Sequence, residues 1–310
     1  MSIPTVDLSP FLNQEHEGTK KAKEIINYAC TAYGFFQIVN HGVPLGLMSE
    51  ALEVSKKFFE IPMEEKVKFS PKEGSPLPTG YSIQPGHSPD KNEYLLMFPP
   101  SSGFNVLPND PPELRKVMED IFSQLSKIGL VLQNILNDCL GLPLKFLEEY
   151  NNDRSWDFMV ALRYFPATEL ENNGITEHQD GNCITFVFQD EGGLEVLKDG
   201  DWIPVAPVEG GLIVNLGDVI QVLSNNKFRS ATHRVVRPEG KSRHSFAFFN
   251  NLEGNKWVEP LPMFSTDIGE PAKYKGFVYK EYQQLRMRNK THPPARPEDA
   301  ISITHYAIPT

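Results

Sequence analysis

Two histidines and one aspartate have the types and the spacing of a metal-binding site. His178 and Asp180 are separated by a single residue, and His233 follows further along the chain. Two imidazoles and one carboxylate can occupy one face of an iron(II) ion and leave the opposite positions open to small molecules. Such an open-sided site is suited to the chemistry of molecular oxygen, so the three residues are predicted to bind iron(II).

The spacing of His178 and Asp180 is informative only if this segment is extended. Residues two apart on a strand point to the same face, whereas on a helix they lie well apart. His233 must then come from a neighbouring strand. The alternative is that all three are ordinary polar residues of strands, which the other motifs of the chain disfavour.

A second polar group lies in the segment RHSFAFF, which has the composition of a strand. Alternation places Arg243, Ser245, Ala247 and Phe249 on one face. A guanidinium beside a hydroxyl is a suitable clamp for a carboxylate. A surface salt bridge is the alternative, but it does not explain why these polar groups share a face with Phe249. The short distance in sequence from His233 also suggests two adjacent antiparallel strands.

These motifs together resemble the iron(II)- and 2-oxoglutarate-dependent dioxygenases, in particular the plant branch that is similar to isopenicillin N synthase. The resemblance spans most of the chain, and the H-x-D motif alone would be weak. The matching segments are YGFFQIVNHGVP (33–44), HQDGNCIT (178–185), GGLEVL (192–197), VNLGDVIQVLSNNKFRSATHRVV (214–236) and RHS (243–245).

The resemblance implies a mechanism and a set of cofactors. Iron(II) would be held by His178, Asp180 and His233, and the distal carboxylate of 2-oxoglutarate by Arg243 and Ser245. Molecular oxygen would be the oxidant, ascorbate would stimulate the reaction, and succinate and carbon dioxide would be released. Hydroxylation is the usual outcome in the family; demethylation, desaturation and ring closure remain open.

One segment departs from the family pattern. Many plant members have N-x-Y-P before the H-x-D motif, and the tyrosine hydroxyl helps to hold the same carboxylate. Here the sequence is Arg163-Tyr164-Phe165-Pro166, and Phe165 cannot donate that hydrogen bond. Either Tyr164 takes the role through a shifted register, or Arg243 and Ser245 hold 2-oxoglutarate with less help.

Hydrophobic periodicity predicts a helical N-terminal part and a strand-rich C-terminal part. Short strands are expected at IPTVDL and GFFQIVN, and short β-rich runs with turn residues between 157 and 262 are typical of a sandwich or barrel. The proline- and glycine-rich stretch 70–111 predicts a long loop with one strand near 92–98, serving as a lid or pocket wall. Helices are predicted at 19–33, 44–60, 112–141 and 275–290.

The family resemblance makes this an α+β fold, with a double-stranded β-helix (jelly-roll) core flanked by helices. The helix at 112–141 has the strongest apolar pattern and is expected to be the backbone helix against which the sheet packs. Residues 1–110 are expected to wrap the core, and residues 111–310 to form the helix, the catalytic jelly roll and the C-terminal helix. The two parts are expected to form one compact unit.

Composition limits the partners of the protein. The 310 residues have a net charge of -10, which argues against a nucleic-acid or anionic-membrane partner. The three cysteines form no C-x-x-C pair, as expected for reduced thiols. With neither a charged leader nor a long apolar run, the chain is predicted to be a cytoplasmic monomer that acts on a small molecule.

The substrate pocket is predicted from aromatic residues. Phe249 shares the clamp face, Phe36 lies in the N-terminal strand, and Tyr81 and Tyr94 lie in the long loop. For the two tyrosines, simple packing is an equally good interpretation. Aromatic walls favour a flat or apolar molecule, and the resemblance suggests a plant hormone or a specialised metabolite such as a flavonoid, terpenoid, alkaloid or phenolic acid.

Other residues and other functions stay open at this stage. His41 is expected to organise a turn, and Asn215 and Asp218 to be scaffold residues of a turn leading to His233; Cys183 either lines the pocket or fills space. An iron oxidase that does not use 2-oxoglutarate and a non-catalytic ligand-binding protein are the alternative functions. Oxygen uptake and succinate release would distinguish the three.

Overall fold

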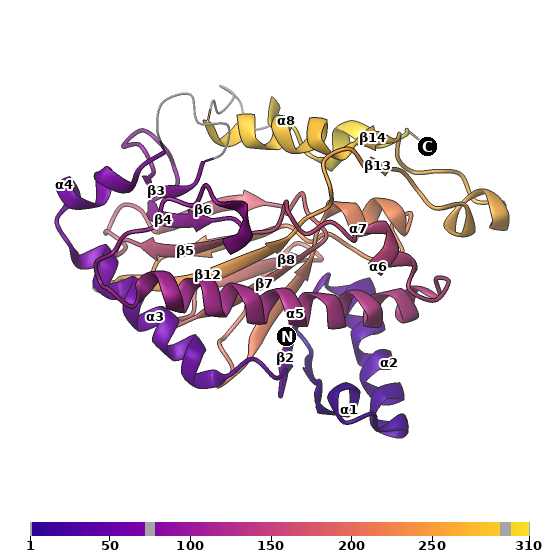
Figure 1. Ribbon diagram of the computed structural model, residues 1–310. Helices are drawn as coiled ribbons and strands as arrows, with labels where there is room; N and C mark the ends of the chain where they lie inside the picture. The colour runs from indigo at the N-terminus through magenta and orange to yellow at the C-terminus, as the bar shows by residue number, and fades with distance from the viewer. Residues whose placement is uncertain (1, 72–77, 292–298, 310) are drawn as a thin grey trace.

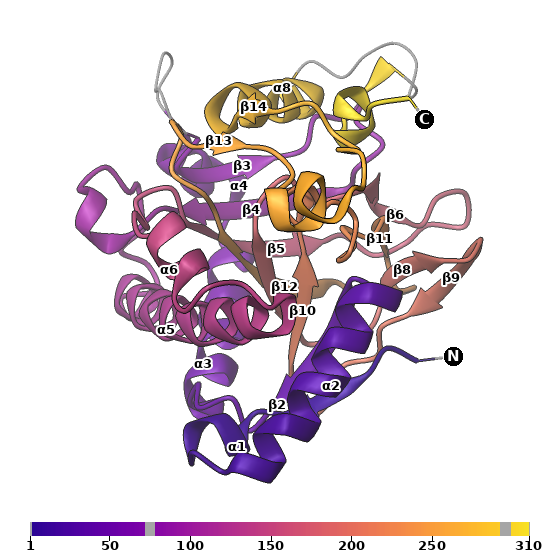
Figure 2. The same cartoon turned by 90° about the vertical axis from the view of Figure 1, so that its right-hand side faces the viewer.

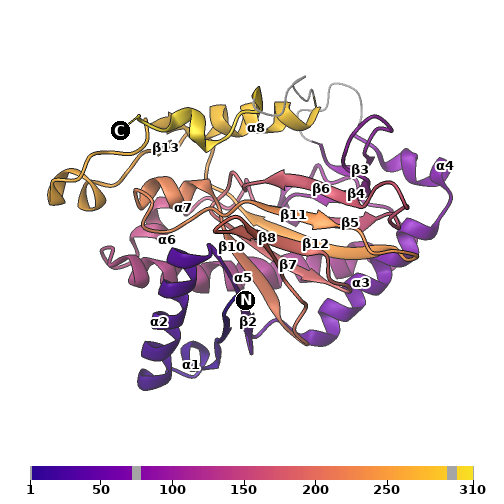
Figure 3. The same cartoon turned by 180° about the vertical axis from the view of Figure 1, so that it is seen from behind.

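The computed structural model describes residues 2–71, 78–291 and 299–309. Two β-sheets face each other in this part of the chain. The long helices cover the outer face of the larger sheet (Figure 1), and the smaller sheet covers its inner face, as the view from behind shows (Figure 3).

Eight strands of the described chain form the major sheet and four form the minor sheet. In spatial order the major sheet contains β1 (Thr5–Asp7), β2 (Phe35–Val39), β10 (Leu212–Leu216), β7 (Ile184–Gln189), β12 (Arg243–Asn250), β5 (Phe158–Tyr164), β4 (Asn92–Met97) and β3 (Gly80–Ile83). The minor sheet contains β6 (Asn173–His178), β11 (His233–Val236), β8 (Leu194–Lys198) and β9 (Asp201–Pro204). A separate pair is formed by β13 (Trp257–Val258) and β14 (Phe277–Val278).

The helices lie mainly before the strand-rich region and at the end of the chain. The α-helices are α1 (Ser9–Leu12), α2 (His16–Ala32), α3 (Leu45–Glu60), α4 (Met63–Lys66), α5 (Leu114–Leu140), α6 (Phe146–Tyr150), α7 (Asp218–Leu223) and α8 (Tyr279–Thr291). Short 3-10 helices occur at Val67–Phe69, Pro100–Ser102, Pro262–Phe264, Thr266–Ile268 and Ile303–Tyr306. Helix α2 lies beside β2 (Figure 2). In the described ranges, no helix is both long enough and apolar enough to cross a membrane.

Helix α5 is the backbone helix that the apolar pattern predicts. Its buried residues recur every three or four positions, so they form one stripe that faces α3 and the major sheet. Phe122 of α5 meets Phe248 of β12 edge to face, with ring centroids 5.0 Å apart. The helix ends at Gly141, whose φ of 73° is a left-handed conformation that glycine adopts without strain.

Side-chain alternation in the major sheet separates two hydrophobic cores. Phe246 and Phe248 of β12 point to the helices and belong to the larger core. Ala247 of the same strand points to the minor sheet and belongs to the smaller core, where Leu194 and Val235 of the minor sheet pack. The inner face of the major sheet is therefore the surface on which a site enclosed by the two sheets must lie.

The predicted elements are confirmed with two corrections. The prediction of adjacent strands after His233 is wrong, because β11 pairs with β6 and β8 whereas β12 pairs with β5 and β7. The predicted loop 70–111 contains a second strand, β3, which pairs with β4. This pairing is not visible in a four-residue segment that begins at a glycine. Residues 72–77 of that loop lie outside the described chain, and its role as a lid stays a prediction.

The predicted division at residue 110 also stays a prediction. Residues before it supply β1, β2, β3 and β4, all of which belong to the major sheet. Sheet hydrogen bonds therefore join this part of the chain to the strands of the catalytic region.

A buried ionic network ties α3 and α4 to the outer face of the major sheet. Glu93 of β4 is fully buried, and its carboxylate accepts hydrogen bonds from Lys66 (2.7 Å), Tyr81 (2.5 Å) and Arg163 (3.1 Å). Lys66 and Arg163 both donate to the carbonyl oxygen of Phe59 at the end of α3 (each 2.9 Å). Because Lys66 is only 4% exposed, Glu93 is needed to neutralise its charge.

We expect Glu93→Gln to lower the free energy of unfolding by about 3 to 5 kcal/mol, because it leaves the buried ammonium of Lys66 without a counter-charge. Urea denaturation measures this change. The matched control is Glu113→Gln, which removes an exposed partner of Lys57 and should leave the unfolding midpoint unchanged. Equal midpoints for both variants would contradict the role of Glu93.

Candidate metal and cosubstrate site

The structure brings His178, Asp180 and His233 together. His178 ends β6 and His233 begins β11, and the two are directly paired across the sheet. The Oδ1 atom of Asp180 lies 3.6 Å from Nε2 of His178 and 3.8 Å from Nε2 of His233. The three ligand atoms lie within 4.8 Å of one another, so they surround a space of the size of a single metal ion.

Backbone carbonyls orient both imidazoles. Nδ1 of His178 lies 2.8 Å from the carbonyl oxygen of Thr176, and Nδ1 of His233 lies 3.0 Å from that of Ala231. A carbonyl oxygen can only accept, so in the neutral rings Nδ1 carries the proton and Nε2 is the unprotonated nitrogen. Both Nε2 atoms lie beside the Asp180 carboxylate. This donor set fits iron(II) with open positions for small ligands.

The second oxygen of Asp180 is held by two side chains of the inner face. Oδ2 accepts hydrogen bonds from Thr185 Oγ1 (2.6 Å) and Asn215 Nδ2 (2.7 Å). Thr185 and Asn215 are paired residues of β7 and β10. Only Oδ1 therefore remains to face the histidines. Thr185 was not identified from the sequence, because nothing in its spacing shows that the chain turns back toward Asp180; Asn215 acts as a scaffold residue within a strand rather than within the predicted turn.

The carboxyl group of Asp180 is stabilised in its charged form. Burial raises its pKa, but the electrostatic interaction with His233, the hydrogen bond and electrostatic interaction with His178 and the hydrogen bond from Thr185 lower it more, so the pKa lies well below its usual value. A metal cation between these ligands would act in the same direction. Asp180 is therefore an ionised ligand.

The clamp predicted on β12 is present on the same inner face. Arg243 is 1% exposed, and Ser245 is also buried. The guanidinium donates to the carbonyl oxygens of Glu191 (3.2 Å) and Gly192 (3.0 Å), to Ser245 Oγ (3.3 Å) and to Gln189 Oε1. All these partners are neutral, and no carboxylate of the described residues forms an ion pair with Arg243. A buried cation without a counter-ion is the environment that a carboxylate ligand fits.

The structure places Tyr164, and not Phe165, beside Arg243. Tyr164 is the strand partner of Arg243, and the guanidinium carbon lies 4.7 Å from the centre of its ring. Phe165 follows the end of β5 and contacts Arg163 instead, at 5.6 Å from guanidinium carbon to ring centre. Arg163 belongs to the ionic network on the outer face. The predicted cosubstrate residue Phe165 is therefore not brought to the clamp.

Two of the four predicted substrate residues lie on the inner face. Phe249 and Tyr94 both pack against the smaller core, between the sheets. The prediction that Phe36 and Tyr81 line the substrate pocket is wrong, because both side chains belong to the larger core between the major sheet and the helices. The hydroxyl group of Tyr81 donates a hydrogen bond to the Glu93 carboxylate.

The phenylalanine of this strand that lies on the inner face is Phe35, the neighbour of Phe36. Phe35 pairs with Asn215 on the inner face, and its ring centroid lies 5.2 Å from that of His233. Because phenylalanine occupies both positions of this strand, the sequence gave no signal to decide which of the two lies on the inner face.

A row of aromatic rings extends along the inner face from Phe249. Its ring stacks on Phe158 at 4.5 Å, Phe158 lies 5.9 Å from Phe98, and Phe98 lies 5.6 Å from Phe104. Phe249 pairs with Thr185, which holds Asp180. The row therefore begins close to the metal site and offers flat apolar surfaces.

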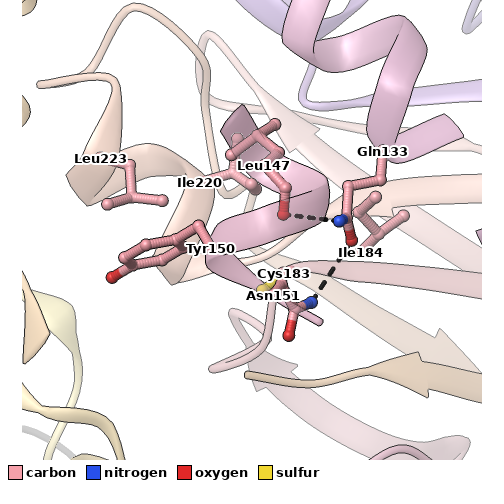
Figure 4. Close-up of a pocket in the computed structure, with 8 residues that line it drawn as sticks. All are labelled: Gln133, Leu147, Tyr150, Asn151, Cys183, Ile184, Ile220 and Leu223. Atoms are coloured by element: carbon pink, nitrogen blue, oxygen red, sulfur yellow. Dashed lines mark hydrogen bonds between the residues drawn. The ribbon is translucent and has the colours of Figure 1, made fainter. Parts of the chain in front are cut away.

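Cys183 belongs to a different cavity. This cavity has a volume of about 10 Å³ and is lined by Gln133, Leu147, Tyr150, Asn151, Cys183, Ile184, Ile220 and Leu223 (Figure 4). It lies among residues that pack against the helices, and its volume is that of a single water molecule. Cys183 therefore fills space in the larger core and does not line the metal site.

His41 organises a turn, as predicted. Its Nδ1 accepts a hydrogen bond from the Val43 amide (3.1 Å), and its Nε2 lies 3.0 Å from the carbonyl oxygen of Gly210. Burial lowers the pKa of His41, so the ring is neutral in this role.

Comparisons with known proteins agree with this geometry. A family model for the 2OG-Fe(II) oxygenase superfamily matches residues 156–252. A second model, described as the N-terminal part of a non-haem dioxygenase in morphine synthesis, matches residues 3–125.

Curated relatives and solved structures cover nearly the whole chain. Flavanone 3-dioxygenase 2 of Oryza sativa subsp. japonica is 31% identical over 293 residues, which are 90% of this chain and 82% of that protein. 1-Aminocyclopropane-1-carboxylate oxidase 5 of Arabidopsis thaliana is 30% identical over 94% of this chain and 96% of its own length. A crystal structure of JOX2 in complex with 2OG, Fe and JA superposes with a TM-score of 0.84 at 28% identity, covering 100% of this chain and 90% of that one. The predicted jelly-roll fold is confirmed by these similarities.

We expect Thr185→Val to weaken iron(II) binding about 10-fold to 100-fold, the usual effect of removing a partner that orients a metal ligand. Anaerobic titration of the metal-free protein measures the affinity. Thr168→Val, at an exposed position, is the matched control and should bind iron(II) as the wild type does. Equal affinities for the two variants would show that Thr185 does not orient Asp180.

We expect Tyr164→Leu to weaken 2-oxoglutarate binding by up to about 2 kcal/mol, the value of a desolvated cation-π contact, because its ring supports the Arg243 guanidinium. Phe165→Leu should leave the affinity unchanged, since Phe165 contacts Arg163 on the other face. Anaerobic titration of 2-oxoglutarate into the iron(II) protein, followed by the metal-to-ligand absorption band, measures both. Weaker binding only in Phe165→Leu would reverse the assignment.

Proposed function

The chain belongs to the iron(II)- and 2-oxoglutarate-dependent oxygenase superfamily, and we propose that it hydroxylates a small, largely apolar molecule of the plant hormone or specialised-metabolite type. One oxygen atom of O2 enters a C–H bond of the substrate and gives the alcohol. The other enters 2-oxoglutarate, which loses carbon dioxide and leaves as succinate. Ascorbate would keep the metal reduced.

The single observation that carries this proposal is the position of Arg243. Its guanidinium is buried, has only neutral partners in the described chain, and lies on the inner face of the major sheet, opposite the minor sheet that carries His178 and His233. A bidentate, permanently charged group is the preferred partner of a carboxylate. Arg243 and Ser245 would hold the distal carboxylate of 2-oxoglutarate, and the ring of Tyr164 would pack against the Arg243 guanidinium.

The metal ligands would act together with the clamp. When bound, iron(II) supplies coordination positions for the keto acid and for oxygen and the redox chemistry of the reaction. His178, Asp180 and His233 would bind it through one face. The apolar residues around this face, including Phe35 beside His233, would exclude water and so limit side reactions.

The class of substrate is inferred from the aromatic row. Phe98, Phe158 and Phe249 offer successive flat surfaces, which favour a substrate with a ring system or an apolar skeleton. The names of similar proteins support the same class, since they include a flavanone dioxygenase and a structure that contains JA. A flavonoid, terpenoid, alkaloid or phenolic acid would match these surfaces. Phe249 and Tyr94 would form part of the pocket wall.

The competing function is an iron oxidase that does not use 2-oxoglutarate, and it has one supporting observation. A relative of 30% identity is named an oxidase of 1-aminocyclopropane-1-carboxylate. Such an enzyme has no need of a buried carboxylate clamp, so Arg243 and Ser245 favour the 2-oxoglutarate-dependent reaction. The requirement for 2-oxoglutarate decides between the two.

We expect the purified protein with iron(II), ascorbate and 2-oxoglutarate to consume oxygen and release succinate when a plant metabolite extract contains its substrate. Metabolite profiling of the extract should show a product that is heavier by one oxygen atom. Arg243→Ala should weaken the binding of 2-oxoglutarate by about 2 to 5 kcal/mol, because a desolvated carboxylate loses its charged partner.

The matched control for this experiment is Arg229→Ala, which removes an exposed arginine and should leave the 2-oxoglutarate requirement unchanged. Substrate oxidation that proceeds equally well without 2-oxoglutarate would establish the competing oxidase function. Tight substrate binding with no oxygen uptake would overturn both.

A further inference from the structure

The C-terminal helix α8 reaches the segment that carries the metal ligand Asp180. Arg286 donates through Nη2 to the carbonyl oxygen of Gln179. Gln283 donates through Nε2 to the carbonyl oxygen of Gly181, at 3.0 Å. The residues on both sides of Asp180 are therefore held by side chains of one helix.

The carbonyl of Asp180 itself is held through a third side chain of α8. Its oxygen accepts a hydrogen bond from the Asp218 amide at the start of α7 (2.8 Å). The Asp218 carboxylate in turn accepts a hydrogen bond from Tyr282 Oη of α8 (2.6 Å). Figures 1 and 3 both place α8 over the side of the fold where β6 and α7 lie.

These contacts matter because Asp180 lies outside the sheet. Strand β6 ends at His178, so the β6–β11 hydrogen bonds that hold the two histidines do not extend to the carboxylate ligand. The backbone of residues 179–181 belongs to no helix or strand, and such connecting segments are more mobile than the strands that they connect. The position of the third metal ligand therefore depends on partners elsewhere in the fold.

Helix α8 is itself firmly placed. Tyr279 and Tyr282 are fully buried. Tyr282 packs against Phe277 at 4.8 Å and Tyr306 at 5.5 Å between ring centroids. Tyr279 donates a hydrogen bond to Asn251 Oδ1 at 2.6 Å. An anchored helix can transmit its position to the backbone that it contacts.

We propose that α8 is a positioning element for the metal site, in which Tyr282, Gln283 and Arg286 hold the Gln179–Gly181 backbone so that Asp180 meets the two imidazoles. This inference rests on the proposed roles of His178, Asp180 and His233. The three α8 residues do not touch the metal, so their effect is on the geometry and the affinity of the site. The simpler alternative is that they only stabilise the fold.

Metal binding by the full-length protein separates these possibilities. Co(II) is titrated into the metal-free wild type and into Arg286→Met, and its ligand-field absorption reports both affinity and coordination. We expect Arg286→Met to bind Co(II) about 10-fold more weakly, as is usual when a group that orients a ligand is lost, and to change the absorption pattern. Thermal unfolding of the metal-free proteins should show little difference.

Two further variants complete the test. Arg288→Met removes an exposed arginine of the same helix and should bind Co(II) as the wild type does. Tyr282→Phe removes only the oxygen that contacts Asp218, so it tests the same role if Arg286→Met does not fold. It should also weaken Co(II) binding and alter the spectrum.

The outcomes are distinct. Wild-type affinity and spectra in both Arg286→Met and Tyr282→Phe would overturn the positioning role, as would a loss of affinity that only follows a loss of folded metal-free protein. A wild-type protein that does not bind Co(II) would overturn the metal site itself and this inference with it. Weak binding in Arg286→Met and Tyr282→Phe, with wild-type binding in Arg288→Met, would leave the metal site intact and establish the role of the helix.

Discussion

The pairing of His178 with His233 across β6 and β11 is the interaction on which the site depends. It sets the two imidazoles 4.3 Å apart between ring centroids, and backbone carbonyls then turn both Nε2 atoms to the same space. Asp180 lies beyond the end of β6, so strand pairing does not hold its carboxylate. Its position is set instead by side chains of other elements: Thr185 of β7 and Asn215 of β10 donate hydrogen bonds to its Oδ2 atom. Strand pairing thus positions the two histidines, and side-chain hydrogen bonds position the aspartate.

Strand alternation explains how two groups of buried charge coexist in one sheet. Arg243 and Tyr164 face the minor sheet, whereas their neighbours His244 and Arg163 face the helices. Arg163 meets Glu93 and is neutralised there, but Arg243 is not. A slip of one residue between β5 and β12 would bring polar groups to the wrong faces. The ionic network on the outer face therefore supports the register that keeps Arg243 and Tyr164 facing the minor sheet.

Features that depend on neighbouring residues could be predicted from the sequence, whereas contacts between residues distant in the sequence could not. The H-x-D spacing identified His178 and Asp180, although the strand that this spacing assumes ends at His178 and Asp180 lies beyond β6. Arg243 and Ser245 do lie together in one strand, β12. Phe35 could not be distinguished from its neighbour, because the strand is buried on both faces and a phenylalanine occupies each of the two positions. The hydrogen bond from Arg286 to the carbonyl oxygen of Gln179 could not be predicted either. The two residues are distant in sequence, and the acceptor is a backbone atom, which no pattern of side chains indicates.

Two buried cations, Lys66 of α4 and Arg243 of β12, differ in whether a carboxylate lies beside them. Lys66 has the Glu93 carboxylate at 2.7 Å and is a closed, structural pair. Arg243 is equally buried, yet its hydrogen bonds end on carbonyl, amide and hydroxyl oxygens. Neutral acceptors satisfy the hydrogen bonds of a guanidinium but not its charge, so burial of Arg243 costs stability in the free protein. A ligand that brings a carboxylate to this point would remove that cost, so the proposed role of Arg243 in binding is the one that its burial without a counter-ion supports.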